Sequence, residues 1–268
     1  MPSRTTDYES FYQTFDSPLM QQVRREAYGE DIGQHSWTSA GELRADVARL
    51  RLSSSSRVID LGCGPCGPLT FVIAAAGCRG TGVDASACAL RAGRARASAR
   101  RVEQQLSVAQ ADLNASLPFS AGCFDAAMSF DVVLHLPDRL KLFREVARLL
   151  QPGGRFLFTD AGVLTGVVSS EDVRRRSVHG ESFFVAPGWN DRLLAAADLG
   201  VIETEDRTGR VLTNASGRLA AMLAHRGELE QQSSPAEFER YKSYLDTVLA
   251  MSRTGGLSRV MYLAEKPS

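Results

Sequence analysis

The sequence predicts a doubly wound α/β fold, in which a mostly parallel sheet is covered by helices on both faces. Two observations lead to this prediction. Strand-like and helix-like stretches alternate between residues 57 and 159, and a glycine-rich turn follows the first predicted strand. The chain has 268 residues, of which 44% are hydrophobic, so it can bury a full core.

The predicted elements of this middle region follow one another in order. Strands are expected at residues 57–61, 80–83, 106–110, 124–130 and 155–159, and helices at 69–76, 87–102 and 137–150. The last of these helices carries apolar residues at helical spacing, among them Leu140, Phe143 and Val146. The Pro152-Gly153-Gly154 turn that follows ends it.

Both flanks of the alternating region look helical. Residues 1–52 are expected to form an N-terminal helical cap, in which Ser39 and Glu42 make a capping box. The remaining residues, 53–268, form the main domain, with a helical lid inserted at about 208–256. A strand is expected after the lid, at residues 258–264.

Composition limits the class of protein. The 31 basic and 31 acidic residues cancel, which argues against a nucleic-acid-binding protein. No apolar run approaches the ~18 residues that a membrane helix needs, and the polar first ten residues do not resemble a secretion signal, so we expect a cytoplasmic protein with no membrane partner. A monomer and a homodimer both remain open.

The glycine-rich turn reads Asp60-x-Gly62-x-Gly64-x-x-Gly67. In open α/β sheets, ligands bind beyond the carboxyl ends of the strands, which is where this turn falls. Glycines allow a tight bend and a close approach of the backbone to a ligand. Nicotinamide and flavin enzymes share the pattern, so the turn alone does not identify the cofactor.

Three carboxylates narrow the choice of cofactor. Asp60 lies at the end of the first strand, where it suits a cationic ligand and would repel a pyrophosphate. Asp84 ends the second strand, where a carboxylate can accept hydrogen bonds from both ribose hydroxyls. Asp112 follows the third strand and is placed for an adenine amino group. Together they favour a positively charged nucleoside such as S-adenosylmethionine.

Cys63 and Cys66 lie in the same turn and match the Cys-x-x-Cys pattern of thioredoxin-like proteins. We interpret them as small residues of the turn, because the chain lacks a second Cys or His pair that would complete a metal site. No metal is therefore expected. A helix N-terminus can lower a thiol pKa, which predicts sensitivity to oxidation.

Taken in order, the stretches 58–64, 82–84, 111–112, 124–135 and 150–154 resemble the motifs of class I S-adenosylmethionine-dependent methyltransferases. The resemblance implies a seven-stranded sheet with an antiparallel last strand. It also implies that Asp84 binds the ribose and that Gly62 and Gly64 face the cofactor. The cofactor-binding residues expected on these grounds are Ser36, Asp60, Gly62, Gly64, Gly67, Asp84, Ala85, Asp112, Leu113 and Phe130.

Asp131 and His135 are the expected catalytic residues. They follow the fourth strand, and the stretch 131–160 resembles phosphoethanolamine and small-amine N-methyltransferases, in which a matching Asp and His face the amine. A histidine titrates near neutral pH and could take a proton from the acceptor, but a purely structural role is equally open. The chain departs from the resemblance at Ala161, where a tyrosine is expected.

The expected reaction is methyl transfer to a nitrogen or oxygen of a small-molecule acceptor. Aromatic residues that could line the acceptor pocket are Tyr12, Phe15, Phe183, Phe184, Trp189 and Tyr241, together with His225. The run Arg174-Arg175-Arg176 could bind an anionic substrate, although a solvated helix face is the favoured interpretation. A nicotinamide-dependent oxidoreductase and a non-catalytic nucleoside-binding module are the alternatives.

Overall fold

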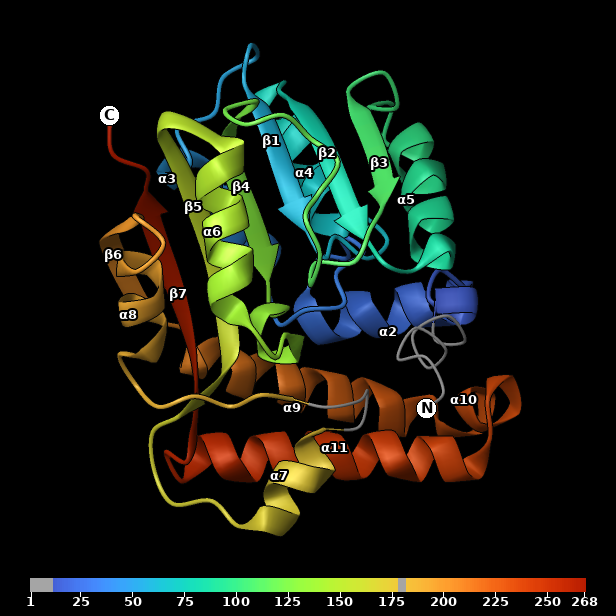
Figure 1. Cartoon of the computed structure of the whole chain (residues 1–268). Helices are drawn as coiled ribbons and strands as arrows, with labels where there is room; N and C mark the ends of the chain where they lie inside the picture. Colours follow the sequence, from blue (N-terminus) through green and yellow to red (C-terminus); the bar gives the residue numbers. More distant parts are fainter. Residues whose placement is uncertain (1–11, 178–181) are drawn as a thin grey trace.

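The computed structural model describes residues 12–177 and 182–268, and seven of its strands form one sheet (Figure 1). Their order is β3-β2-β1-β4-β5-β7-β6. The strands are β1 (Arg57–Leu61), β2 (Arg79–Asp84), β3 (Leu106–Gln110), β4 (Phe124–Phe130), β5 (Leu150–Leu164), β6 (Gly200–Asp206) and β7 (Leu257–Glu265). β7 runs antiparallel to both of its neighbours, whereas the pairings from β3 through to β5 are parallel. The predicted sheet is confirmed.

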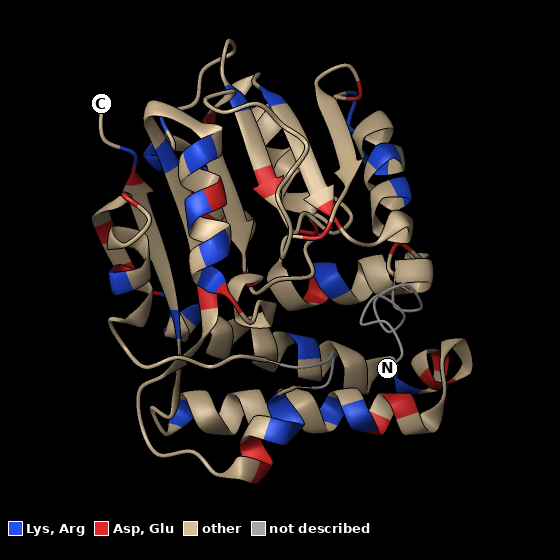
Figure 2. Ribbon diagram, viewed as in Figure 1, with Lys and Arg blue, Asp and Glu red and all other residues tan. Residues whose placement is uncertain are grey.

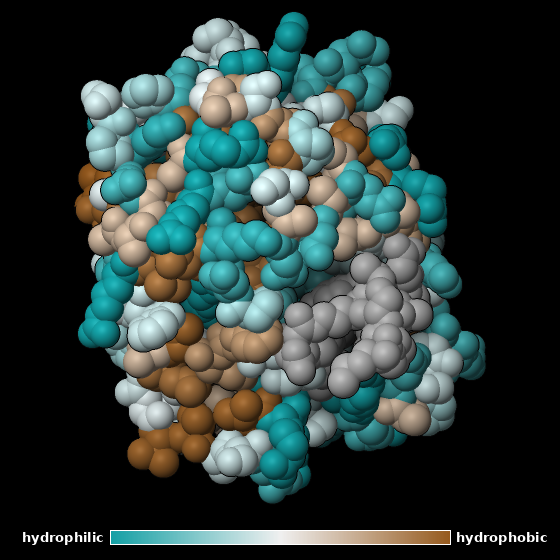
Figure 3. Space-filling view, in the orientation of Figure 1, coloured by the Kyte–Doolittle hydropathy of each residue, from teal (hydrophilic) through white to brown (hydrophobic). Residues whose placement is uncertain are grey.

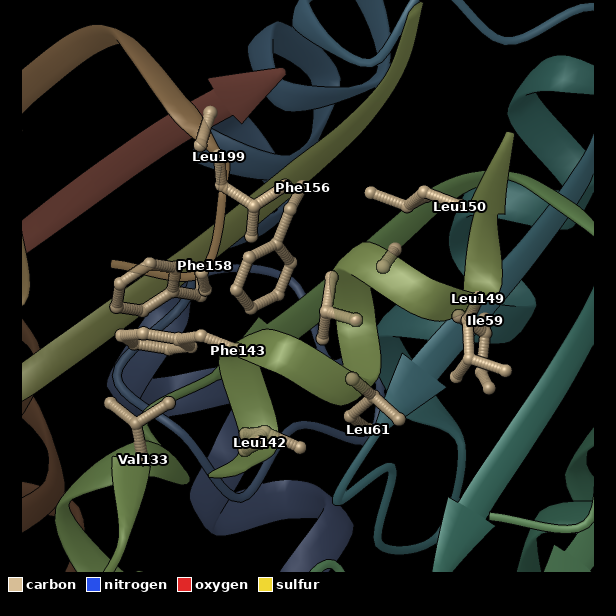
Figure 4. Close-up of a cluster of buried hydrophobic side chains, with 14 of the residues drawn as sticks. Ile59, Leu61, Val133, Leu142, Phe143, Leu149, Leu150, Phe156, Phe158 and Leu199 are labelled. Atoms are coloured by element: carbon tan, nitrogen blue, oxygen red, sulfur yellow. The ribbon is translucent and has the colours of Figure 1, made fainter. Parts of the chain in front are cut away.

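Helices cover both faces of the sheet (Figure 1). α3 (Ala40–Arg49), α4 (Gly67–Ala76) and α5 (Ala87–Ala99) pack on one face, and α6 (Arg139–Leu149) and α8 (Trp189–Ala195) on the other. On the α6 face, Phe143 meets Phe156 and Phe158 of β5, with ring centroids 5.9 and 5.2 Å apart (Figure 4). These buried aromatic contacts fix α6, and with it the loop before α6, against the sheet.

A third helical layer crosses the carboxyl ends of the strands (Figure 1). It consists of α2 (Pro18–Tyr28), α7 (Ser170–Arg176), α9 (Thr208–Ala224), α10 (Arg226–Gln232) and α11 (Pro235–Arg253). α9 packs against both α2 and α11, and the layer has its own apolar core around Leu245 and Val248. The two helices of the predicted N-terminal segment therefore separate, since α2 joins this layer while α3 packs on α4.

Helix ends follow the local sequence. Ser39 and Glu42 form the predicted capping box, in which the Ser39 Oγ accepts from the Glu42 backbone amide and the Glu42 carboxylate accepts from that of Ser39. Ser234 caps α11, which begins with Pro235. β5 extends well beyond the predicted strand 155–159, because Asp160–Leu164 continue to pair with β7.

The outer surface of α5 and α6 is largely hydrophilic (Figure 3). Apolar side chains gather at the lower left of that view, where Figure 1 places the loop between β5 and α7, and Val167 in this loop is 99% exposed. Among the helices within residues 12–177 and 182–268, none combines the length and apolar character needed to cross a bilayer.

Candidate functional site

A cavity of about 520 Å³ lies between the carboxyl ends of the strands and the helical layer that crosses them. Its volume is in the range of sites that bind small molecules. It is lined by eleven of the twelve residues that the sequence indicated: Ser36, Asp60, Gly62, Gly64, Asp84, Ala85, Asp112, Leu113, Phe130, Asp131 and His135. The sequence motifs thus come together at one place in the fold.

The glycine turn after β1 forms the floor of the cavity. Gly62 and Gly64 adopt positive φ angles of 75° and 50°, a backbone region that favours glycine. A Cβ on Gly62 would lie 2.6 Å from the side chain of Val132, so any larger residue would displace the loop after β4. The backbone N–H of Gly64 donates to Asp84 Oδ2 at 2.8 Å, which ties the turn to the end of β2.

Gly67, the remaining expected cofactor residue, does not line the cavity. It begins α4, and a Cβ there would lie 2.1 Å from the carbonyl oxygen of Gly33. Gly67 therefore lets the N-terminal segment that carries Ser36 pass close to α4. This position favours a packing role, and the expected contact of Gly67 with the cofactor stays a prediction.

Asp60 lies at the end of β1 and is 2% exposed. Its Oδ2 has no hydrogen-bond partner among the described residues. Burial, with added repulsion from Asp84, raises the pKa of the Asp60 carboxyl well above its ordinary value. A buried carboxylate without a partner at the wall of a cavity fits a ligand that brings a positive charge, such as the amino group of S-adenosylmethionine.

Asp84 and Asp112 lie on the same side of the cavity as Asp60, and Figure 2 shows acidic residues at the ends of β1 and β2. The Asp84 Oδ1 accepts from the Ser86 backbone amide at 2.9 Å, so the carboxylate is held in place at the end of β2. Asp112 Oδ1 accepts from the Asn114 amide at 2.9 Å. Leu113 is buried and supplies an apolar wall beside them.

Asp131 lies just after β4, and its carboxylate is occupied by three protein donors. Oδ1 accepts from Arg259 Nε at 2.9 Å and from Thr159 Oγ1 at 2.8 Å, and Oδ2 accepts from the Trp37 backbone N–H at 2.9 Å. Although burial opposes ionisation, the Arg259 guanidinium holds the pKa of Asp131 below its ordinary value. Such a carboxylate is a poor proton acceptor, and the expectation that Asp131 is catalytic stays a prediction.

His135 ends the short 3₁₀ turn η1 (Val133–His135), which lies against the cavity. The Phe183 backbone N–H donates to the Leu134 carbonyl at 2.6 Å, and Arg139 Nη2 donates to the Phe183 carbonyl at 2.6 Å. Arg139 itself pairs with the fully buried Asp160. These contacts fix the backbone of the turn and so hold His135 at the cavity wall.

The far end of the cavity is built from residues that sequence reasoning did not single out as a group. Arg218 of α9 lies over the Trp37 ring, 4.7 Å from its centroid, and donates to the Tyr241 hydroxyl at 3.2 Å. Arg176 of α7 lies over the Tyr244 ring at 5.1 Å. Of the arginine run in α7, Arg174 and Arg175 are exposed, whereas Arg176 is buried and lines the cavity.

Among the aromatic candidates, Tyr12 and Tyr241 line the cavity as expected. Trp189 is 45% exposed at the start of α8, and the remaining candidates do not line the cavity. His225 bonds to Glu26 and Glu228 at the outside of the helical layer. Sequence position cannot separate these cases, because a helix brings only one of its faces to a pocket.

Cys63 and Cys66 lie with their sulfur atoms 3.6 Å apart beneath the glycine turn, and both are buried. Burial raises the pKa of the Cys63 thiol well above its ordinary value. The predicted oxidation sensitivity assumed a lowered thiol pKa, which is wrong for Cys63. Desolvation raises the pKa of this thiol more than the N-terminus of α4 can lower it. The two sulfurs fill space against Gly82 and Gly93, where a Cβ would be too close.

The doubly wound sheet, the glycine turn after β1 and the acidic ends of β1 and β2 together fit a nucleoside-binding α/β fold. Residues 59–158 match the family model described as a methyltransferase domain. Sarcosine/dimethylglycine N-methyltransferase of Halorhodospira halochloris is 30% identical over 237 residues, which cover 81% of each chain. This chain belongs to the class I S-adenosylmethionine-dependent methyltransferases, and the cofactor is S-adenosylmethionine.

Two further comparisons concern the sequence and the fold. Methyltransferase GfsG of Streptomyces halstedii is 33% identical over 132 residues, which span 49% of this chain and about half, 46%, of that relative. Phosphoethanolamine N-methyltransferase 2 of Haemonchus contortus, solved with phosphomonomethylethanolamine and S-adenosylhomocysteine, superimposes with a TM-score of 0.84 at 19% identity, covering 100% of this chain and 61% of that one. None of these supports the oxidoreductase or non-catalytic alternatives.

Proposed function

We propose that this methyltransferase acts on a small molecule and transfers the methyl group to nitrogen, the more strongly supported of the two expected atoms, nitrogen and oxygen. The observation that carries the proposal is one continuous cavity, with carboxylates at the strand ends and arginines and aromatic rings at the other end. Two of the proteins compared above are N-methyltransferases by name. Such a cavity can hold the cofactor and a small acceptor together.

The cofactor end follows from the positions of the carboxylates. Asp60 would pair with the amino group of the methionine moiety, and Asp84 would accept from the ribose hydroxyls. Asp112 would accept from the adenine amino group. Gly62 and Gly64 would allow close approach of the backbone, and the contacts that complete the surface would come from Ser36, Ala85, Leu113 and Phe130.

When bound, S-adenosylmethionine supplies an activated methyl group with a neutral leaving group. The protein then has to align the acceptor and exclude water, which the helical layer across the strand ends provides. We assign His135 to the acceptor, where it would hydrogen-bond to the nitrogen and take its proton if it carries one. Asp131 would act indirectly, by holding Trp37 and Arg259 in place.

Isothermal titration calorimetry with S-adenosylmethionine, followed by transfer of labelled methyl to a panel of small amines and phenols, tests the proposal. We expect micromolar or tighter cofactor binding and transfer to amines. Cofactor binding with transfer confined to phenols would overturn the assignment to nitrogen. Transfer of the labelled methyl group to RNA or DNA would overturn the assignment of a small-molecule acceptor.

We also propose a cytoplasmic protein that is a monomer or a homodimer and that has no nucleic-acid partner. The balanced charge of the chain supports the last point, because nucleic-acid binders usually carry a basic surplus. Light scattering of the purified protein measures the oligomeric state directly.

A further inference from the structure

Arg176 is a buried cation without a counter-charge in the described part of the chain. It ends α7, is 6% exposed and lines the cavity. Its Nε has no hydrogen-bond partner among the described residues, and the Ala161 carbonyl lies 3.5 Å from Nη2, at the limit of a hydrogen bond. Burial of an unpaired guanidinium is costly, so the position points to a ligand that supplies the missing acceptor.

Arg218 brings a second buried cation to the same end of the cavity. It is 8% exposed, and its Nη2 donates to the backbone carbonyls of His35 and Ser36 at 2.7 and 3.0 Å. Those acceptors are neutral, and within residues 12–177 and 182–268 no carboxylate forms an ion pair with Arg218. Arg218 therefore has hydrogen-bond acceptors, but no negative charge among the described residues balances its positive charge.

Aromatic rings connect the two arginines. Arg176 lies over Tyr244, whose ring stacks on that of Tyr241 with centroids 5.5 Å apart, and the Tyr241 hydroxyl accepts from Arg218. Tyr244 also stacks on Trp37 at 6.2 Å. This wall of the cavity therefore combines two guanidinium groups and a tyrosine hydroxyl with stacked aromatic rings.

The cavity is thus divided by charge. Asp60, Asp84 and Asp112 make the cofactor end acidic, whereas Arg176 and Arg218 make the opposite end basic. Asp131 also lines the cavity, but Arg259 forms an ion pair with it. The acidic end suits a cationic cofactor. The basic end has no negative charge among the described residues to balance its two arginines.

We propose that Arg176 and Arg218 form a subsite for an anionic oxygen group, a carboxylate or a phosphate, of the methyl acceptor. The acceptor is then a small amine that carries an anion at its other end, held so that its nitrogen faces His135. This inference rests on the proposed function, which it extends from the kind of reaction to the class of substrate. Guanidinium groups recognise both carboxylates and phosphates through paired N–H donors.

Matched acceptor pairs test the subsite by activity. Sarcosine is compared with its uncharged amide, and phosphoethanolamine with ethanolamine, which separates a carboxylate acceptor from a phosphate acceptor. We expect transfer to favour the anionic member of one pair. Arg176→Gln should raise the KM of that member by about 10- to 100-fold, the loss typical of one charged hydrogen bond, while cofactor affinity is unchanged. Arg176→Lys should recover part of the loss.

Arg175→Gln is the matched control, because Arg175 lies one residue away on α7, is exposed and pairs with Glu171 at the surface. It should leave KM unchanged. Arg176→Gln should not lower the Tm of the free protein, because it removes a buried charge that has no counter-charge. Equal transfer to both members of each pair, or a KM unchanged by Arg176→Gln, would overturn the subsite while leaving methyltransferase activity in place.

A binding measurement that needs no turnover distinguishes a failure of the anion subsite from a failure of the proposed function. The protein is saturated with S-adenosylhomocysteine and titrated with acetate, inorganic phosphate or methylammonium chloride, with Tm as the readout. Acetate or phosphate should raise the Tm of the wild type and not that of Arg176→Gln, even if no acceptor in the panel is methylated. If neither anion raises Tm, the subsite is rejected. If S-adenosylhomocysteine itself does not bind, the proposed function fails first.

Discussion

Replacing Asp60 with asparagine should weaken cofactor binding and, at the same time, raise the stability of the cofactor-free protein. The side chain is 2% exposed, and its Oδ2 has no partner among the described residues. Asparagine keeps the shape and removes the charge. If the carboxylate pairs with the amino group of S-adenosylmethionine, its loss should cost about 1.5–3 kcal/mol of binding free energy, or about 10- to 150-fold in Kd.

The same variant should be more stable than the wild type when no cofactor is bound. Burial raises the pKa of Asp60 in the folded protein, so the folded state holds a proton that the unfolded state releases. Wild-type stability therefore falls as pH rises from the ordinary aspartate value, about 3.9, through the raised folded value. Asp60→Asn lacks this loss, so its Tm should exceed that of the wild type at neutral pH and match it in acid.

Cofactor binding should show the opposite dependence on pH. Asp60 must be ionised to pair with an ammonium group, so the affinity of the wild type should rise with pH through the raised pKa of Asp60. The affinity of Asp60→Asn should stay flat over that range. Titration calorimetry and thermal unfolding from pH 4 to 8 measure both effects, with Asp246→Asn on the surface of α11 as the control. Wild-type affinity for cofactor in Asp60→Asn would refute the assignment.

Three other substitutions test the remaining parts of the site. Asp84→Ala should weaken S-adenosylmethionine binding by about 10- to 100-fold, because charged hydrogen bonds to the ribose are lost; an unchanged calorimetric Kd would exclude Asp84 as the ribose ligand. His135→Ala should lower kcat by about 100-fold, with cofactor Kd within about twofold, if His135 takes a proton from the acceptor; normal turnover would leave it a structural residue. Arg259→Met should lower the free energy of unfolding by about 3–5 kcal/mol, because Asp131 is left buried without its cation and Glu42 keeps only the longer 3.7 Å ion pair with Arg207; denaturant unfolding measures this, and a loss below about 1 kcal/mol would show that the ion pairs are not needed.

The central strands were predictable from sequence because their pattern is local. β4 begins at Phe124 and ends at Phe130, as the apolar run predicts. β6 was not predicted, since as the edge strand it is mostly exposed and carries Glu203 and Glu205. α8 was not predicted, and α7 was expected only as the helix face that carries Arg174–Arg176, because helices of seven residues are too short to show a clear apolar period.

The sequence also predicted the cofactor end of the cavity better than the acceptor end. The cofactor end is made of turns that directly follow strands, so the spacing of Asp60, Gly62 and Asp84 was enough to locate it. The acceptor end depends on contacts between distant segments: Arg218 bonds to His35 across 183 residues of sequence. Arg176 looked like one member of a solvated run, and nothing in a single sequence shows that its neighbours face outward while it faces inward.

The ion cluster around Arg259 affects how the enzyme is completed during synthesis. This arginine belongs to β7, which follows the other six strands of the sheet in sequence, yet its guanidinium binds Asp131 at the end of β4, as well as Glu42 and Thr38 from the N-terminal region. Until β7 has been synthesised, Asp131 lacks its cation, and the Trp37 segment lacks its anchored carboxylate. The nascent chain therefore gains a fully formed pocket only after β7 has joined the sheet.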